Sequence, residues 1–258
     1  MLTVTEQFAA TNSILFAGIR IDYVDFNSII RVVKNSIKQN NKVKIIYANA
    51  FSIVVANKNK RFRLALLNAD IVHPDGIGIW IGLKFLYRSK SLLRFNWTDY
   101  GFDFLKTCEE NQWTIFFLGS TNDILMKARE NLKKKYPRLK LLGTLNGYEN
   151  VDSNETIELI NNLNVDILYV GLGTPKQEIW INDNAQKLNC RVIQAVGDLF
   201  SLYADEKKRG PKFFQQVGLE WFFRLLGNPI KYARRYLLGI PQFFIIVIKQ
   251  YLNKKSNE

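Results

Sequence analysis

The sequence contains few of the residues that bind catalytic metal ions. There is one histidine, His73, and the two cysteines, Cys108 and Cys190, lie far apart in the chain. A zinc site needs three or four such ligands close together, so we predict no zinc site. No two aspartates flank a single residue, an arrangement that would offer oxygen ligands to a divalent cation on a nucleotide diphosphate. We therefore expect neither a bound metal nor a cofactor.

The sequence also lacks the segments that direct a chain into or across a membrane. Its first twenty residues have no basic start followed by an apolar run, so we expect no secretory signal. No run of 18 apolar residues occurs, so no transmembrane helix is predicted. The two cysteines show no partner spacing, which favours buried thiols in a reducing compartment.

The residues that are present favour an α/β fold. Of the 258 residues, 47% are hydrophobic, which is enough for the core of one large domain or two small lobes. Short apolar segments alternate with helical patterns, which is typical of a Rossmann-like parallel sheet with helices on both faces. We expect Asp25 and Thr98 to cap two of the helices. The strands are expected at residues 14–23, 43–48, 113–118, 139–142, 166–170 and 191–196.

Ligands of such sheets bind beyond the carboxyl ends of the strands. Polar candidates at these positions are Asn49, Ser120, Tyr148, residues 171–178 and Asp198.

A further candidate, Asp75, lies between turn-forming residues. Pro74 fixes its own φ, while Gly76 and Gly78 allow a tight turn and close approach by another molecule. On such a turn Asp75 can face a cleft and act as a general base. The alternative is a β-turn in which Asp75 only favours the turn. The neighbouring His73 is expected to be structural.

A second glycine-containing motif ends at Glu178 and combines a strand end, a turn and a helix start. Gly171 and Gly173 form the turn, Thr174 is a good N-cap, and Gln177 completes a capping box. A phosphate can bind at such a helix N-terminus, so the motif favours a phosphate or nucleotide-sugar site. A nicotinamide-binding fingerprint would need glycine at the sixth position, where the sequence has lysine.

The end of the chain is basic and aromatic. Residues 212–258 hold eight Lys or Arg residues, two Glu residues and ten aromatic residues, in a chain whose net charge is +13. Lys231, Arg234 and Arg235 are spaced to share one helix face, and residues 243–248 are all apolar. A solvated basic face or a nucleic-acid contact would explain the charge alone. The combination with apolar and aromatic residues favours a helical appendage on an anionic membrane surface.

These patterns divide the chain into a catalytic core, residues 1–211, and an appendage, residues 212–258. Because the predicted sheet is complete by Val196, we expect the core to fold without the appendage.

Four motifs, in order, resemble those of the WecG/TagA/CpsF glycosyltransferases of bacterial surface-polysaccharide and teichoic-acid synthesis. They lie at residues 68–78, 170–178, 209–211 and 218–236. The resemblance covers most of the chain and implies an inverting, metal-independent glycosyltransferase with a UDP-sugar donor. The implied acceptor is a sugar on a polyprenyl diphosphate, and the best-studied members transfer N-acetylmannosamine to lipid-linked N-acetylglucosamine.

The resemblance also implies a cellular setting. The chain is expected to be cytoplasmic and peripheral on the inner face of the cell membrane. Its expected partners are the UDP-sugar, the lipid-linked acceptor and the anionic membrane surface, with no nucleic acid. The resemblance leaves room for a homo-oligomer.

The functional residues of the family fall on matching positions of this sequence. The catalytic base falls on Asp75. The implied substrate-binding positions are Asn49, Arg94, Thr98, Asp99 and Tyr148, to which the motifs add Gly171, Gly173, Gln177, Glu178 and Arg209. With no metal motif, helix N-termini and arginines must neutralise the leaving diphosphate, and the candidate arginines are Arg224, Arg234 and Arg235.

Four positions depart from the family pattern. Ser201 stands where the family usually has Asp, and Asp205 where it usually has Gly. Tyr47 replaces a usual Thr, and Trp97 a common Gly. These departures leave the identity of the donor open, so that it can be another UDP-hexose or a uronic acid. They do not affect Asp75.

Two other functions remain open on the residues alone. A nucleotide-binding oxidoreductase would need the glycine that is missing from the second motif. A membrane-surface binding module without catalysis would explain the appendage but not the turn at Asp75.

Overall fold

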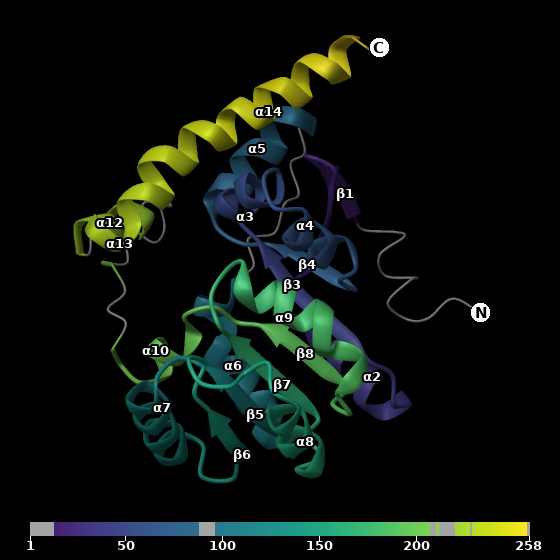
Figure 1. The fold of residues 1–258 in the computed structure, drawn as a ribbon, viewed down its shortest axis with the longest axis vertical. Coiled ribbons are helices and arrows are strands. Elements are labelled where there is room, and N and C mark those ends of the chain that lie inside the picture. Colours follow the sequence, from purple (N-terminus) through teal and green to yellow (C-terminus); the bar gives the residue numbers. More distant parts are fainter. Residues whose placement is uncertain (1–12, 88–95, 207–209, 212–219, 228, 257–258) are drawn as a thin grey trace.

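The protein is built on a six-stranded parallel sheet (Figure 1). The computed structural model describes residues 13–87, 96–206, 210–211, 220–227 and 229–256. The strand order is β4-β3-β8-β7-β5-β6, and every neighbouring pair is parallel. The strands are β3 (Val43–Ala48), β4 (Ile71–Pro74), β5 (Thr114–Gly119), β6 (Lys140–Leu145), β7 (Ile167–Gly171) and β8 (Val192–Ala195). The predicted parallel α/β fold is therefore confirmed.

Helices cover both faces of this sheet, as the sequence predicts, and each face has its own hydrophobic cluster. One face packs against α2 (Phe26–Gln39), α6 (Trp97–Glu110), α7 (Asn122–Lys135) and α10 (Leu199–Tyr203). The other packs against α3 (Ala50–Ala56), α4 (Lys60–Leu67), α5 (Ile77–Tyr87), α8 (Asn154–Asn162) and α9 (Lys176–Asn184). A 3₁₀ turn, Ala185–Lys187, follows α9. An antiparallel pair, β1 (Ser13–Phe16) and β2 (Ile19–Asp22), packs on the same hydrophobic cluster as α3, α4 and α5.

Side-chain caps begin several of the helices. Asp25 accepts a hydrogen bond from the Ser28 amide and starts α2, as predicted. The prediction that Thr98 caps α6 is wrong. The Asn96 side chain accepts the hydrogen bond from the Asp99 amide, and α6 begins at Trp97. The two buried cysteines are free thiols, as expected.

One strand is longer than the sequence indicates. Gly143 was expected to end the strand, but it pairs with Phe116 inside β6. A side chain at this position would meet the Phe116 ring, since an added Cβ would lie 2.6 Å from it. Here glycine permits close packing and does not end the strand.

The chain ends in a series of helices over the second face. They are α12 (Glu220–Gly227), α13 (Pro229–Ala233), a π-helical turn (Arg234–Leu238) and α14 (Gly239–Ser256). Lys231 lies in α13, and Arg234 and Arg235 lie in the π turn; the side chains of Lys231 and Arg234 are outside the described part, so their shared face stays a prediction. Among the described helices, none has both the length and the hydropathy that a membrane crossing requires.

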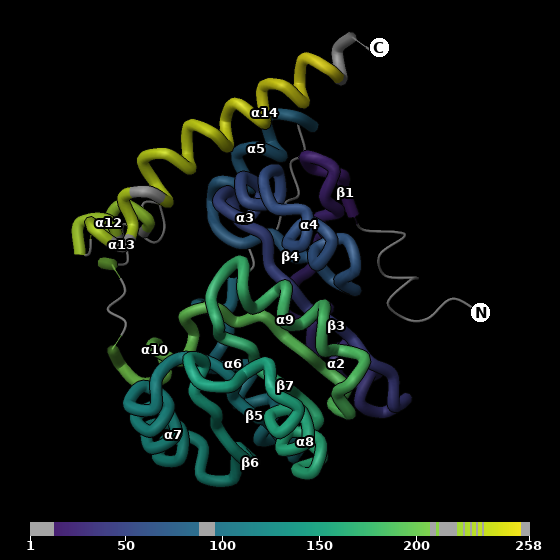
Figure 2. The backbone as a smooth tube through the Cα atoms, in the orientation of Figure 1, coloured from purple at the N-terminus to yellow at the C-terminus, as the bar shows by residue number. Residues whose placement is uncertain are grey.

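Helix α14 packs on α3 and α5 (Figure 2). Phe243 and Val247 are buried in the core cluster, and the Phe243 ring stacks on Phe16 with centroids 5.8 Å apart. The Gln250 side chain accepts a hydrogen bond from the Ala17 amide at 2.8 Å. The sheet is complete at β8, as predicted, and α14 adds Phe243 and Val247 to the hydrophobic cluster on one of its faces.

The opposite side of α14 is apolar and exposed. Its exposed side chains include Phe244, Ile245, Ile248 and Leu252. The apolar run 243–248 thus divides between a core-facing side and a solvent-facing side, because a helix turns through its whole circumference in 3.6 residues.

Candidate functional site

The carboxyl ends of four neighbouring strands bring the main candidates together. Asn49 follows β3 and Asp75 follows β4, while the Gly171 motif follows β7 and Gly197 follows β8. Because β3 lies between β4 and β8 and all strands are parallel, these segments meet at one edge of the sheet. This is where the sequence places them.

Asp75 lies at the junction of β4 and α5. Its backbone amide donates a hydrogen bond to the Ala48 carbonyl at 2.8 Å, which continues the pairing of β4 with β3. Gly76 has a φ of +77°, which favours glycine, and the space around its Cα is open. The turn therefore holds Asp75, a partly exposed residue, at the sheet edge.

Asn49 has a structural role in addition to its position. Its Oδ1 atom accepts hydrogen bonds from the Ser52 amide at 3.0 Å and from the Ser52 hydroxyl at 3.3 Å. The side chain thereby caps α3. Its Nδ2 amide group is the part that would be offered to a ligand.

The predicted capping box at the start of α9 is wrong. The N-cap position is Pro175, which makes no side-chain cap bond. The Thr174 hydroxyl donates instead to Glu178 Oε1 at 2.8 Å. Gln177 Oε1 accepts from the Gly197 amide at 3.0 Å. These side chains form a tertiary network across β7, β8 and α9.

Tyr47 completes this network from β3. Gln177 Nε2 donates to the Tyr47 hydroxyl oxygen at 3.1 Å and to Glu178 Oε1 at 2.9 Å. Burial, followed by the negative charges of Glu178 and Asp75, raises the pKa of Tyr47 to about 12, against lowering first by the hydrogen bond with Thr174 and then by the positive charge of Arg235. Asp75 and Arg235 are therefore close enough to act electrostatically on the same phenol.

Glu178 is a fully buried carboxyl group in this network. Burial raises its pKa to about 7, although the hydrogen bonds from Gln177 and Thr174 and the charge of Arg235 favour its ionised form. Its Oε2 atom has no hydrogen-bond partner in the described structure. Glu178 therefore changes its charge near neutral pH.

We expect Glu178→Gln to remove a pH dependence of stability. The folded chain keeps the Glu178 proton up to about pH 7, whereas the unfolded chain releases it near 4.5. Wild-type stability should therefore fall as the pH rises through this window. At 1.36 kcal/mol per pKa unit, the loss between pH 5 and pH 8 should be smaller in the variant by roughly 2 to 3 kcal/mol.

Urea unfolding at the two pH values measures this difference. Glu158→Gln, on the exposed side of α8, is the control and should keep the wild-type pH dependence. An unchanged pH dependence in Glu178→Gln would show that this carboxyl group is ionised in the folded chain well below neutral pH.

His73 is structural, as the sequence indicates. It is fully buried, and burial lowers its pKa to about 3. Trp97 Nε1 donates to its Nε2 atom at 2.9 Å, which is consistent with a neutral ring. This contact holds the start of α6 next to β4.

Other predicted residues lie further from this network. Thr98 and Asp99 are in the first turn of α6, where the Asn96 side chain donates to an Asp99 carboxylate oxygen at 2.6 Å. Tyr148 is 77% exposed after β6. At about 4.8 Å per strand, β6 and β4 lie roughly 24 Å apart across the sheet. Arg94 and Arg209 lie outside the described residues.

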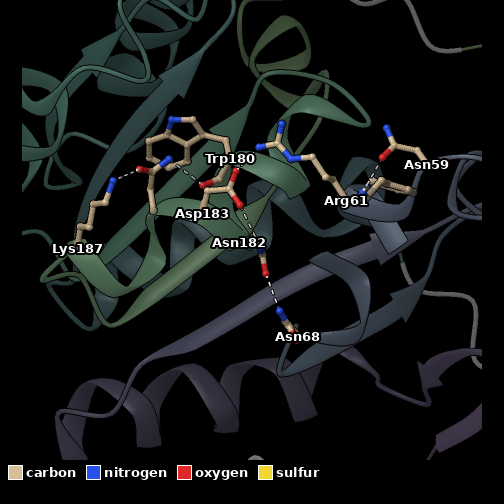
Figure 3. A network of polar contacts seen from close by, with 9 residues as sticks. Asn59, Arg61, Asn68, Trp180, Asn182, Asp183 and Lys187 are labelled. Atoms are coloured by element: carbon tan, nitrogen blue, oxygen red, sulfur yellow. Dashed lines mark hydrogen bonds and ion pairs between the residues drawn. The ribbon is translucent and has the colours of Figure 1, made fainter. Parts of the chain in front are cut away.

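A polar network on the outer surface fixes α9 relative to α4 (Figure 3). Arg61 pairs with Asp183 at 2.7 Å, and the Asn68 side chain donates to Asn182 at 2.9 Å. Since α9 carries Gln177 and Glu178 at its start, these contacts help to set their position relative to β4.

The comparisons with known proteins match this architecture. The model of the glycosyl transferase WecG/TagA/CpsF family matches residues 14–257. The chain belongs to this family. It is therefore a glycosyltransferase, and the oxidoreductase and the non-catalytic binding module are set aside.

Three similar proteins cover almost the whole chain of this glycosyltransferase. Each is named N-acetylglucosaminyldiphosphoundecaprenol N-acetyl-beta-D-mannosaminyltransferase. The protein of Bacillus spizizenii is 28% identical over 89% of this chain and 89% of its own length. That of Bacillus subtilis is 27% identical over 92% and 88%. That of Staphylococcus aureus strain MW2 is 26% identical over 95% of each chain.

Arg235 is the tail arginine whose side chain the structure of this glycosyltransferase describes. Its guanidinium carbon lies 5.3 Å from the centroid of the Phe51 ring, on α3. Phe51 comes two residues after Asn49, so this cation–π contact holds the π turn near the sheet edge. Arg224 lies in α12 and Arg234 begins the π turn, but their side chains lie outside the described part.

The sequence reasoning missed Tyr47 and Phe51 as site residues. Tyr47 was noted as a departure from the family but was not given a role, because a tyrosine in an apolar strand is typical of a core. One signal was available: Tyr47 lies two residues before Asn49, at the carboxyl end of the strand.

Proposed function

We propose that this chain is an inverting, metal-independent glycosyltransferase that moves a sugar from a UDP-sugar to a polyprenyl-diphosphate-linked sugar. The transferred sugar is N-acetylmannosamine, a related hexose or a uronic acid. The observation that carries the proposal is that Asp75 follows β4, the strand paired with the Tyr47 strand, while Arg235 packs on Phe51 at the start of α3, and both charges act on the Tyr47 phenol. A base and a cation close together are what a transfer with an anionic leaving group requires.

Asp75 acts as the general base in this proposal. Its carboxylate removes the proton from the acceptor hydroxyl, whose oxygen then attacks the anomeric carbon from the face opposite the UDP group. The bond to the diphosphate breaks as the new bond forms, so the configuration inverts. The departing UDP carries the negative charge away.

Arg235 stabilises that departing charge, with Arg224 and Arg234 as further candidates. In a partly desolvated site, a fixed guanidinium lowers the energy of a developing oxyanion more than it would in water. Asn49, Gln177 and Glu178 bind or orient the donor from the ends of β3 and β7. Gly173, with a φ of +76° in open space, allows the donor to approach the backbone, whereas Gly171 permits close packing, since an added Cβ would lie 2.6 Å from the Phe200 ring.

The acceptor and the membrane belong to the same proposal. The similar proteins are named for an undecaprenol-linked N-acetylglucosamine acceptor, and we infer a lipid-linked sugar acceptor here. The exposed apolar side of α14, together with the basic residues of the appendage, supports peripheral binding to an anionic membrane. We place this surface on the inner face of the cell membrane, in cell-surface polysaccharide or teichoic acid synthesis.

The division into a catalytic core of residues 1–211 and an appendage of residues 212–258 remains a proposal, as does a homo-oligomer. The core supplies the base and the donor site. The appendage supplies Arg235 and the membrane surface. Nucleic acid has no part in this function.

A transfer assay tests the proposal. The full chain is incubated with a synthetic lipid-diphosphate sugar and a panel of UDP-sugars, in EDTA, and products are identified by mass spectrometry. We expect one UDP-sugar to give a disaccharide product with inverted anomeric configuration. No product with any UDP-sugar, or activity that appears only after magnesium or manganese is added, would contradict the proposal.

A further inference from the structure

The Tyr47 side chain crosses the sheet edge between the base and the α9 network. It leaves β3 opposite His73, with the two rings 6.2 Å apart. Its hydroxyl reaches β8, where a Cβ added to Gly197 would lie only 2.6 Å from it. Gly197 has a φ of +58°, so glycine both suits this turn and leaves room for the phenol. The ring therefore occupies the centre of the site.

The hydrogen bonds of Tyr47 can be counted. Gln177 Oε1 accepts from the Gly197 amide, which fixes the orientation of the Gln177 side chain and turns its Nε2 group to Tyr47. The Tyr47 oxygen is therefore an acceptor in that bond. Its own proton needs a different partner.

The nearest acceptor for that proton in the described structure is poor. Thr174 Oγ1 lies 3.5 Å from the Tyr47 oxygen, at the outer limit of a hydrogen bond. The Thr174 hydroxyl already donates to Glu178. Tyr47 is a half-buried residue, and its O–H proton, which lacks a good acceptor among the described residues, is the proton left for a ligand oxygen at the sheet edge.

The protonation state of Tyr47 fits a donor role. Burial, followed by the charges of Glu178 and Asp75, raises its pKa to about 12. The phenol therefore keeps its proton throughout the physiological pH range. A neutral O–H donor near the end of β3, beside the strand that leads to Asp75, is suited to bond an oxygen of the transferred sugar.

We propose that Tyr47 is a specificity-determining residue that donates its hydroxyl proton to an oxygen of the transferred hexose and limits the size of that hexose with its ring. This inference rests on the proposed function, because it assigns a contact within the same donor site. The chemical class of the ligand is a UDP-hexose with a hydrogen-bond acceptor on the side of the sugar that faces β3 and β8.

Tyr47→Phe tests the hydrogen bond. The substitution keeps the ring, and Gln177 Nε2 keeps its bond to Glu178, so the fold should be retained. We expect kcat/KM for the preferred UDP-sugar to fall about 10- to 100-fold, the usual effect of losing one specific hydrogen bond to a substrate. The preference over other UDP-hexoses should fall as well, while the affinity for UDP without a sugar should not change.

Tyr169→Phe is the matched control. Tyr169 lies on β7 and is fully buried, and its hydroxyl has no hydrogen-bond partner in the described structure. This variant should keep the donor preference of the wild type. Tyr47→Thr, which keeps a hydroxyl but removes the ring, should raise the relative rate with bulkier UDP-hexoses.

The outcomes separate this inference from the proposed function. If Tyr47→Phe and Tyr47→Thr both transfer sugar at the wild-type rate and with the wild-type donor preference, the role of Tyr47 is overturned. The proposed function is not affected by that result. If the wild type transfers no sugar, calorimetry with UDP and the UDP-sugars still measures how much the sugar adds to affinity in each chain. A wild type that binds no UDP-sugar would overturn both.

Discussion

Asp75→Asn is expected to fold as the wild type does and to transfer sugar at least about 100-fold more slowly, the usual effect of losing a general base. The side-chain amide has nearly the shape of the carboxylate but cannot take up the proton of the acceptor hydroxyl. The backbone bond from Asp75 to Ala48 does not involve the side chain, so the turn should persist. Steady-state kinetics with a soluble acceptor measures the loss of turnover.

Two controls complete this experiment. UDP affinity in Asp75→Asn should stay within a few-fold of the wild type, because the base contacts the acceptor. Asp123→Asn removes an exposed carboxylate from α7, which carries no candidate site residue, and should leave turnover unchanged. Wild-type turnover in a folded Asp75→Asn chain would show that another group takes the proton.

Removal of residues 212–258 is expected to abolish transfer, even to a short-chain, water-soluble acceptor. The cut removes all three candidate arginines, and losing a single group that stabilises a developing anion typically lowers turnover about 100- to 1000-fold. Binding to anionic vesicles should also be lost, because the exposed apolar side of α14 and six of the net positive charges leave with it. Co-sedimentation with vesicles and sugar transfer to the soluble acceptor measure the two effects separately.

The same truncation should lower the stability of what remains. It removes Phe243 from its stack on Phe16, and the loss of one buried phenylalanine side chain typically costs about 3 to 5 kcal/mol. The core should therefore fold less stably without the appendage than with it.

Arg235→Gln in the full chain separates catalysis from folding. It keeps Phe243 and Val247 in place, and turnover should fall about 100-fold. Lys249→Gln, an exposed cation on α14, is the matched control and should retain full activity with the soluble acceptor. Normal turnover in Arg235→Gln and in the truncated chain would restrict the appendage to an anchor.

Local patterns were sufficient to predict five of the six strands of the parallel sheet, but not β4, Ile71–Pro74. The alternation of short apolar segments with helices gave the parallel strands, and Asp25 and Asn49 stand where a helix needs an acceptor for its first amides. The turn at Asp75 was also predictable, since Pro74 and Gly76 restrict or permit backbone angles regardless of distant contacts.

The errors came from contacts between distant segments. Thr98 and Asn96 are both good caps, and Trp97, whose indole donates to His73 on β4, belongs inside the helix that Asn96 begins. Thr174 has the right type for an N-cap, but its hydroxyl bonds to the buried Glu178. The role of Tyr47 depends on Gln177, 130 positions later, and no local pattern contains that information.

The contact between Ala17 and Gln250 has a consequence for biosynthesis. The Ala17 amide and the Gln250 side chain that bonds to it are 233 positions apart. A ribosome that adds about 5 to 20 residues per second needs roughly 10 to 50 seconds to cover that distance. Throughout that interval the Phe16 surface lacks its covering helix, so this part of the core can close only after residue 250 has been made.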